Sequence, residues 1–268
     1  MATEDLVPAG GAAPGVVPED ADLETLLARD PALDALSKLV TGRLGDDPAH
    51  DVHHAMRVAR WTVRLAGEES GRADDDPGRG AGGGEGADEL PVTPRLALAA
   101  ALLHDVVNVP KDHPDRSQAS ARSAAFAREV LRELRFRPAE VRIIAEAIED
   151  HSFSRGATPR SALGRALQDA DRLEALGAIG ICRVLSTGAR MGSRYFDPAD
   201  PWAERRELDD KSFSVDHFFT KLLRLPETMQ TDAGRAEATR RADTLHHFLD
   251  ALADELDVPR PGSGVPSP

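Results

Sequence analysis

The chain has 268 residues, 41% of them hydrophobic, which is enough for one sizeable core. A formal net charge of −13 argues against a broad polyanion-binding surface and so against a scaffold for nucleic-acid polymers. The single cysteine, Cys182, excludes a disulfide framework within the chain and a metal site built from thiolates.

The two ends of the sequence and the lack of long apolar runs set the expected context. No stretch is apolar and long enough to span a membrane, and the first residues lack the basic-then-apolar pattern of a secretion signal. We therefore expect a cytoplasmic protein with no membrane association. Residues 1–20 and 258–268 are rich in Gly and Pro and are predicted to be disordered tails on one domain at 21–257.

Between the tails the sequence predicts an all-α fold. Apolar residues recur about every 3.6 positions, and alternating strand patterns with tight turns are missing. Pro94 and Pro138 stand where helices are expected to begin. The glycine-rich segment 71–91 cannot build a core and is predicted to be a flexible insertion. The expected helices cover residues 22–41, 48–70, 93–107, 117–135, 138–152, 160–190, 212–226 and 230–256.

The second expected helix begins with several histidines, in HDVHHAMRVARWTVRLA at 50–66. At about 100° per residue, His53 falls on the solvent side with arginines, whereas His54 lies on an apolar flank. Taken alone, His54 is better explained as a core histidine bonded to a backbone carbonyl. His50 and Arg57 lie at the edge of the helix, where capping and surface charge are the simpler interpretations.

The third helix, in RLALAAALLHDVVNVPK at 95–111, is apolar all round until His104 and Asp105. Such a helix is buried on every side, and its first polar groups are two potential metal ligands. Adjacent residues point about 100° apart, so both reach one ion only near a helix end, which Pro110 supplies. The alternative is a buried histidine followed by a helix-ending Asp, but a negative charge there opposes the helix dipole unless a cation lies nearby.

The stretch LQDADRLEALGAIGICR at 167–183 places two acids among apolar residues, where unpaired carboxylates are costly. Asp171 lies on the shoulder of the apolar face and is predicted to point inward, while Asp169 lies on the other side. The alternative is that Asp171 pairs with a buried arginine. The inward-facing candidates from three helices offer two imidazoles and two carboxylates, a set that suits Mn²⁺, Ni²⁺, Mg²⁺, Fe²⁺ or Zn²⁺: His54, His104, Asp105 and Asp171.

These residues, within HDVHHAMRV, ALLHDVVNVPK, AIEDHSFSRG and LQDADRLEALGAIGICR, resemble the HD-domain metal-dependent phosphohydrolase superfamily. The similarity covers roughly residues 25–256 without the glycine-rich segment, and it is to a branch of small bacterial and fungal HD hydrolases. It implies a single all-α HD domain, the four ligands just named, and one divalent ion, with Mn²⁺ favoured. It also implies hydrolysis of a (d)NTP to a (d)NMP and pyrophosphate.

Two positions depart from the patterns of this superfamily. Asn108 stands where some HD nucleotidases have a Glu that helps to activate water, and Glu174 stands where this branch typically has Asp. A nucleotide phosphomonoesterase and a non-catalytic metal- and nucleotide-binding sensor are therefore kept as alternatives, as is an oxygenase with two irons. The expected partner is a nucleotide substrate, and a homodimer is left open.

Further residues are candidates for catalysis and for substrate binding. Asp169, or Asp105 among the ligands, could orient or deprotonate the water, and His50 could donate to a leaving oxygen. Lys111, just after the His-Asp pair, is the first choice as a phosphate clamp. For each of these a structural or solvated role is the competing interpretation. The candidates for substrate binding are Arg57, Lys111, His151 and Lys221.

Overall fold

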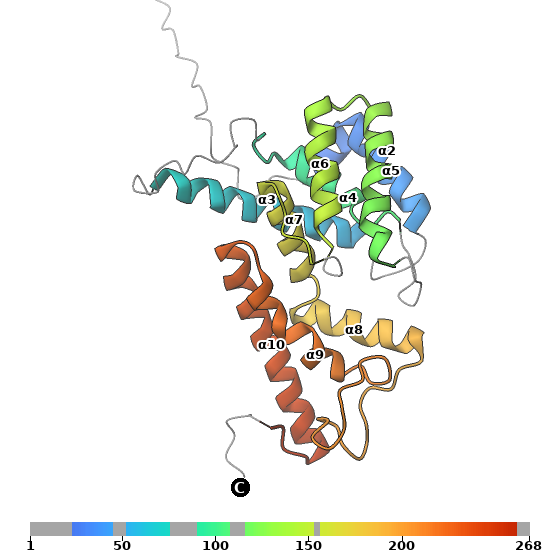
Figure 1. Cartoon of the computed structure of the whole chain (residues 1–268), viewed down its shortest axis with the longest axis vertical. Coiled ribbons are helices and arrows are strands. Elements are labelled where there is room, and N and C mark those ends of the chain that lie inside the picture. Colours follow the sequence, from blue (N-terminus) through green and yellow to red (C-terminus); the bar gives the residue numbers. More distant parts are fainter. Residues whose placement is uncertain (1–22, 45–51, 76–89, 108–115, 153–155, 262–268) are drawn as a thin grey trace, which may run out of the picture.

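The computed structural model describes residues 23–44, 52–75, 90–107, 116–152 and 156–261 (Figure 1). These residues form helices and one isolated β-bridge, between Arg194 and Phe213, so the all-α prediction is confirmed. The helices are α1 (Leu23–Arg29), α2 (Pro31–Leu44), α3 (Val52–Asp75), α4 (Pro94–Leu103), α5 (Ala119–Glu133), α6 (Pro138–Asp150), α7 (Ala162–Leu173), α8 (Gly177–Met191), α9 (Asp216–Thr220) and α10 (Asp232–Leu256), with 3₁₀ helices η1 (Arg116–Gln118) and η3 (Leu222–Thr228).

Helix α4 lies at the centre of the helices that carry the predicted ligands. Every residue from Leu96 to Leu103 is at most 3% exposed, as expected for a helix with no polar face. It packs against α2, α3, α6 and α7. Thr93 caps it by accepting a hydrogen bond from the Leu96 amide, and Pro94 occupies its first turn, as predicted.

Helix α7 connects this group to the C-terminal helices. It packs on α3 and α6 on one side and on α10 on the other, and α10 also contacts α8 and η3. In Figure 1, α8, α9 and α10 lie together below α7, away from α2, α5 and α6. The site residues on α7 are therefore held between two layers of helices.

The helix expected at 160–190 is two helices. The chain turns after Leu173 through tight hydrogen bonds, from the Glu174 amide to Asp171 O and from the Leu176 amide to Leu173 O. Gly177 then adopts φ +68°, a conformation that side chains disfavour. Apolar periodicity runs through this turn without a proline, so the pattern hides the break.

Other expected boundaries also differ. Asp30 splits the first helix because its carboxylate accepts hydrogen bonds from the amides of Ala32 and Leu33. The helix expected at 212–226 is the short α9 followed by η3, which contains Pro226. Helix α3 continues to Asp75, so the first residues of the expected insertion are helical, and 76–89 lie outside the described residues.

The expected C-terminal tail begins later than predicted. Trp202 Nε1 donates to the carbonyl of Val258 at 3.0 Å, and Arg260 pairs with Asp250 on α10. The chain is therefore held to the body of the protein for a few residues beyond α10. The tails at 1–20 and 262–268 lie outside the described residues. None of the described helices is both long and apolar enough to cross a membrane.

Candidate metal centre

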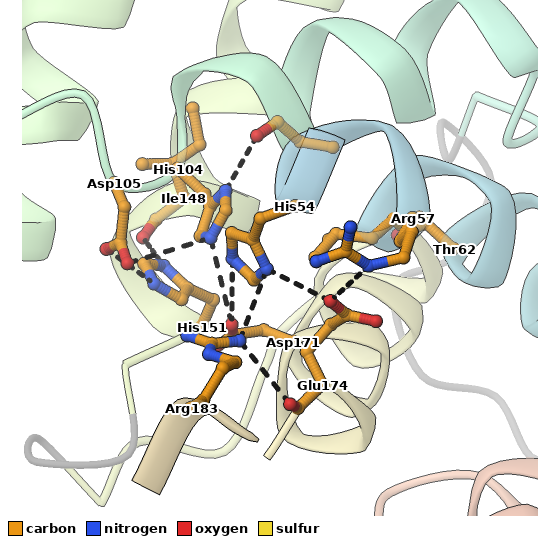
Figure 2. Close-up of polar contacts among 12 residues, drawn as sticks. His54, Arg57, Thr62, His104, Asp105, Ile148, His151, Asp171, Glu174 and Arg183 are labelled. Carbon is orange, nitrogen blue, oxygen red and sulfur yellow. Dashed lines mark hydrogen bonds and ion pairs between the residues drawn. The ribbon is translucent and has the colours of Figure 1, made fainter. Parts of the chain in front are cut away.

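Three buried imidazoles meet at the ends of three helices (Figure 2). His54 is on α3, His104 follows α4, and His151 follows α6; they are 1%, 2% and 4% exposed. The ring centroids of His54 and His104 lie 5.4 Å apart, and those of His104 and His151 lie 5.1 Å apart. The structure thus adds His151, predicted as a substrate ligand, to the two histidines predicted as metal ligands.

In His104 and His151, the ring nitrogen that points away from the cluster is Nδ1, and it lies close to a backbone carbonyl oxygen. His104 Nδ1 lies 2.7 Å from the carbonyl oxygen of Ala101, and His151 Nδ1 lies 2.6 Å from that of Ile148. A carbonyl only accepts, so both Nδ1 atoms carry the hydrogen and both neutral rings keep a lone pair on Nε2. Local helix-end geometry therefore aims two Nε2 atoms into the same space.

The Nε2 atoms of the three histidines point into the cluster and face carboxylates at distances too long for good hydrogen bonds. Asp171 Oδ1 lies 3.6 Å from His54 Nε2 and 3.8 Å from His104 Nε2. Asp105 Oδ2 lies 3.7 Å from His104 Nε2, and its Oδ1 lies 3.5 Å from His151 Nε2. Lone pairs facing carboxylate oxygens repel one another unless a proton or a cation lies between them.

This arrangement fits a metal ion. Two ligand atoms that each lie about 2.1 Å from an ion are about 3.0–3.6 Å apart for angles of about 90–120°, close to the spacing seen here. His104 Nε2 is buried and makes no hydrogen bond within the described part of the chain. The two groups of donor atoms, His54–His104–Asp171 and His104–Asp105–His151, share His104, whose single available nitrogen can serve one ion. The residues therefore suit one ion rather than two.

The carboxylates of the cluster favour a proton on His104 when no ion is bound. Burial alone would lower the pKa of His104, but the carboxylates of Asp105 and Asp171 raise that pKa to about 9. Burial would raise the pKa of Asp171, and the neighbouring imidazoles hold it well below its ordinary value instead. A divalent cation would take the place of that proton among the same acids.

Glu174 orients His54 from the side opposite the cluster. It follows α7, is fully buried, and its Oε2 lies 3.3 Å from His54 Nδ1 and 2.8 Å from Arg57 Nε. Burial would raise the pKa of Glu174, but hydrogen bonds from His54 and Arg57 lower it overall. A charged Glu174 holds the hydrogen on Nδ1 and leaves His54 Nε2 as a ligand atom. Sequence reasoning noted Glu174 only as a departure; its position one turn after Asp171 was the available signal.

Arg57, predicted as a substrate ligand, supports Glu174 through its Nε. Lys221 lies between α9 and η3, which pack mainly on each other and on α10. His50 and Lys111 lie outside the described residues, as does Asn108. The structure therefore brings together His54, His104, Asp105, Asp171 and His151 from the predicted set.

Asp169 does not face this cluster, which corrects the prediction that it activates water. Its side chain is fully buried, its Oδ1 accepts from the Gln230 amide at 2.8 Å, and its Oδ2 accepts from the Thr231 amide and hydroxyl, both at 2.8 Å. Burial raises the pKa of Asp169, and these three donors counter that rise only in part. Asp169 therefore anchors the start of α10.

We expect Asp169→Asn to lower the free energy of unfolding by about 1–3 kcal/mol, because the amide can no longer accept all three hydrogen bonds in the buried site. Urea denaturation followed by circular dichroism measures this change, with exposed Asp254→Asn on α10 as the matched control. Metal stoichiometry should stay unchanged. A variant of normal stability without turnover would restore Asp169 to catalysis.

Comparisons with known proteins identify the family of this chain. The HD domain family model matches residues 51–176, which include the four predicted ligands. The uncharacterized protein YpgQ of Bacillus subtilis is 31% identical over 217 residues, covering 80% of this chain and 87% of YpgQ. The chain belongs to the HD superfamily. It is an HD-superfamily hydrolase of the metal-dependent phosphohydrolase kind, as the resemblance of its sequence implied.

Solved structures of similar proteins share the fold. An HD-superfamily hydrolase from Bacillus thuringiensis is 26% identical with a TM-score of 0.56, covering 84% of this chain and 97% of its own. Bacillus subtilis YpgQ in complex with ADP superposes with a TM-score of 0.58 at 23% identity, covering 85% of this chain and 98% of its own. Both matches cover most of this chain, including parts beyond residues 51–176, which the family model covers.

Proposed function

We propose that this HD hydrolase cleaves nucleoside or deoxynucleoside triphosphates between the α- and β-phosphates, giving the monophosphate and pyrophosphate. The observation that carries the proposal is the buried set of Nε2 atoms that face Asp105 and Asp171 across 3.5–3.8 Å. A nucleotide substrate is supported by the solved complex of the relative YpgQ with ADP.

In this proposal, different residues of the chain would bind the ion and transfer the proton. His54, His104, Asp105 and Asp171 would hold the ion, for which we favour Mn²⁺ because it accepts mixed nitrogen and oxygen donors. When bound, such an ion polarises phosphoryl oxygens and lowers the pKa of a nearby water. The side chains of Asp105 and Asp171 are 33% and 28% exposed, so the cluster opens to solvent on its carboxylate side, where a polyphosphate can enter.

In this proposal, His151 would donate a proton to the leaving group. Its Nδ1 is committed to the Ile148 carbonyl at 2.6 Å, so Nε2 is the atom that faces the cluster. A proton on that atom would be positioned for transfer to the leaving phosphate oxygen. Asp105, whose Oδ1 lies 3.5 Å from this nitrogen, would keep the ring in place. His50 stays a prediction for proton donation to the leaving oxygen, and Lys111 for binding phosphate. A cytoplasmic location and a homodimer also stay predictions.

The test is a panel of the purified chain with Mn²⁺, Mg²⁺, Ni²⁺ or Co²⁺ against the common NTPs and dNTPs, with products separated by ion-exchange chromatography. We expect equal amounts of monophosphate and pyrophosphate, only when metal is present, and about one ion per chain by elemental analysis. Release of orthophosphate without pyrophosphate would contradict cleavage between the α- and β-phosphates; release of orthophosphate from an added nucleoside monophosphate would favour the phosphomonoesterase. Stoichiometric nucleotide binding without turnover under all metals would make it a sensor.

A further inference from the structure

Arg183 lies beside the metal centre although it belongs to α8, beyond the segment that the HD family model covers. Its Nη1 is 3.2 Å from His54 Nδ1 and 3.5 Å from the carbonyl oxygen of Glu174 (Figure 2). Two glycines set the start of α8: Gly177 makes the turn after α7, and at Gly180 a Cβ would come within 2.2 Å of the Ala175 carbonyl oxygen. The start of α8 therefore packs closely on the turn at Ala175, and Arg183, further along α8, lies beside His54.

The guanidinium of Arg183 is not paired with an acid of the described residues. Within the described part of the chain it makes no ion pair, and its polar contacts are the ring nitrogen and the carbonyl just named. Arg57, by contrast, donates to Glu174 Oε2 at 2.8 Å. A half-buried positive charge beside a cation site is unfavourable by itself and calls for an anion at the same place.

The contact between Arg183 and His54 also competes with the one made by Glu174. A guanidinium can only donate, so its bond requires a lone pair on His54 Nδ1 and places the ring hydrogen on Nε2. The carboxylate of Glu174 can only accept, so its bond requires the hydrogen on Nδ1 and frees Nε2. A histidine that ligates an ion through Nε2 must keep the second arrangement. Arg183 therefore has to leave His54 whenever His54 ligates an ion.

We propose that Arg183 is a phosphate ligand of the substrate, and this inference rests on the proposed function of the same site. When His54 donates its Nδ1 hydrogen to Glu174, the Arg183 guanidinium keeps only its contact with the Glu174 carbonyl oxygen at 3.5 Å. It can then bind an anion. A phosphate that meets the ligand set lies next to His54 and so within reach of Arg183. The planar fork of arginine suits two phosphate oxygens at once.

The experiment separates metal binding from anion binding by calorimetry on the full chain. Arg183→Gln removes the charge, Arg183→Lys keeps it without the fork, and Arg190→Gln makes the same charge change at an exposed position of α8. Each protein is titrated first with Mn²⁺ alone. At saturating Mn²⁺ it is then titrated with pyrophosphate and, separately, with a nucleoside triphosphate analogue that cannot be hydrolysed. Circular dichroism verifies that each variant is folded.

We expect Arg183→Gln to bind Mn²⁺ within about threefold of the wild type and to bind both anions roughly ten- to a hundredfold more weakly, as for a lost charged hydrogen bond. Arg183→Lys should fall between, and Arg190→Gln should match the wild type. Unchanged anion affinity in Arg183→Gln would overturn the inference, and so would loss of Mn²⁺ binding, which would make Arg183 a support of the metal centre.

Failure of the proposed function gives a different result. If the wild type binds pyrophosphate with Mn²⁺ but binds and hydrolyses no nucleotide, the proposed function is wrong, and the effect of Arg183→Gln on pyrophosphate still decides the role of Arg183. If the wild type with Mn²⁺ binds neither anion, the assignment of Arg183 is wrong as well.

Discussion

Replacing His104 with alanine should abolish stoichiometric Mn²⁺ binding and lower turnover of nucleoside triphosphates at least about a thousandfold, because the ion contributes several kcal/mol to transition-state stabilisation. His104 Nε2 belongs to both groups of donor atoms in the cluster, so its loss disrupts each of them. Calorimetry with Mn²⁺ and a chromatographic assay of pyrophosphate release measure the two effects.

The matched control is His53→Ala, since His53 neighbours His54 on α3 but is exposed. This variant should bind Mn²⁺ and turn over substrate like the wild type. Circular dichroism shows whether His104→Ala is folded, and retention of Mn²⁺ binding by a folded His104→Ala would contradict the assignment of the centre. Loss of activity in both variants would point to a general effect on α3 and α4.

Glu174→Gln should weaken Mn²⁺ binding about ten- to a hundredfold, the usual effect of losing a group that orients a metal-bound histidine. The neutral amide no longer holds the hydrogen on His54 Nδ1 as firmly, and Arg183, 3.2 Å from the same atom, then competes for it. The substitution keeps the side chain's shape, so the effect should appear in metal affinity more than in thermal stability.

Calorimetry with Mn²⁺ tests this, with exposed Glu255→Gln on α10 as the control for loss of one negative charge. A second test combines Glu174→Gln with Arg183→Gln: removing the competing donor should recover part of the metal affinity. Equal Mn²⁺ affinity in the wild type and Glu174→Gln would show that His54 is oriented by something else.

Much of the cluster could be predicted because it depends on local helix geometry. The faces of single helices separated His54 from His53 and Asp171 from Asp169, and the end of α4 placed His104 beside Asp105. The structure brings these predicted ligands together, while their binding of an ion stays a prediction. The periodicity that placed them is a property of each helix by itself, so no knowledge of the packing was needed.

What escaped prediction depends on how the helices cross. His151 was predicted to bind substrate, but its position beside His104 follows from the packing of α6 on α4, which no single helix encodes. Arg183 was overlooked because one continuous helix at 160–190 would carry it away from His54, whereas the turn at Gly177 brings it back. Asp169 was misassigned because its partners lie at the start of α10, far along the chain.

The bonds of Asp169 tie the site to a part of the chain that contributes no predicted ligand to it. Asp169 meets Thr231, 62 residues further on, and Arg241 of α10 donates to the carbonyl of Leu173 at 2.7 Å. Both acceptors flank Asp171, so these contacts hold the part of α7 that carries this predicted ligand. A fragment limited to 51–176 would strip these donors away and leave buried oxygens unsatisfied. We therefore expect sequence drift in α10 to change the affinity for an ion without any substitution among the predicted ligands.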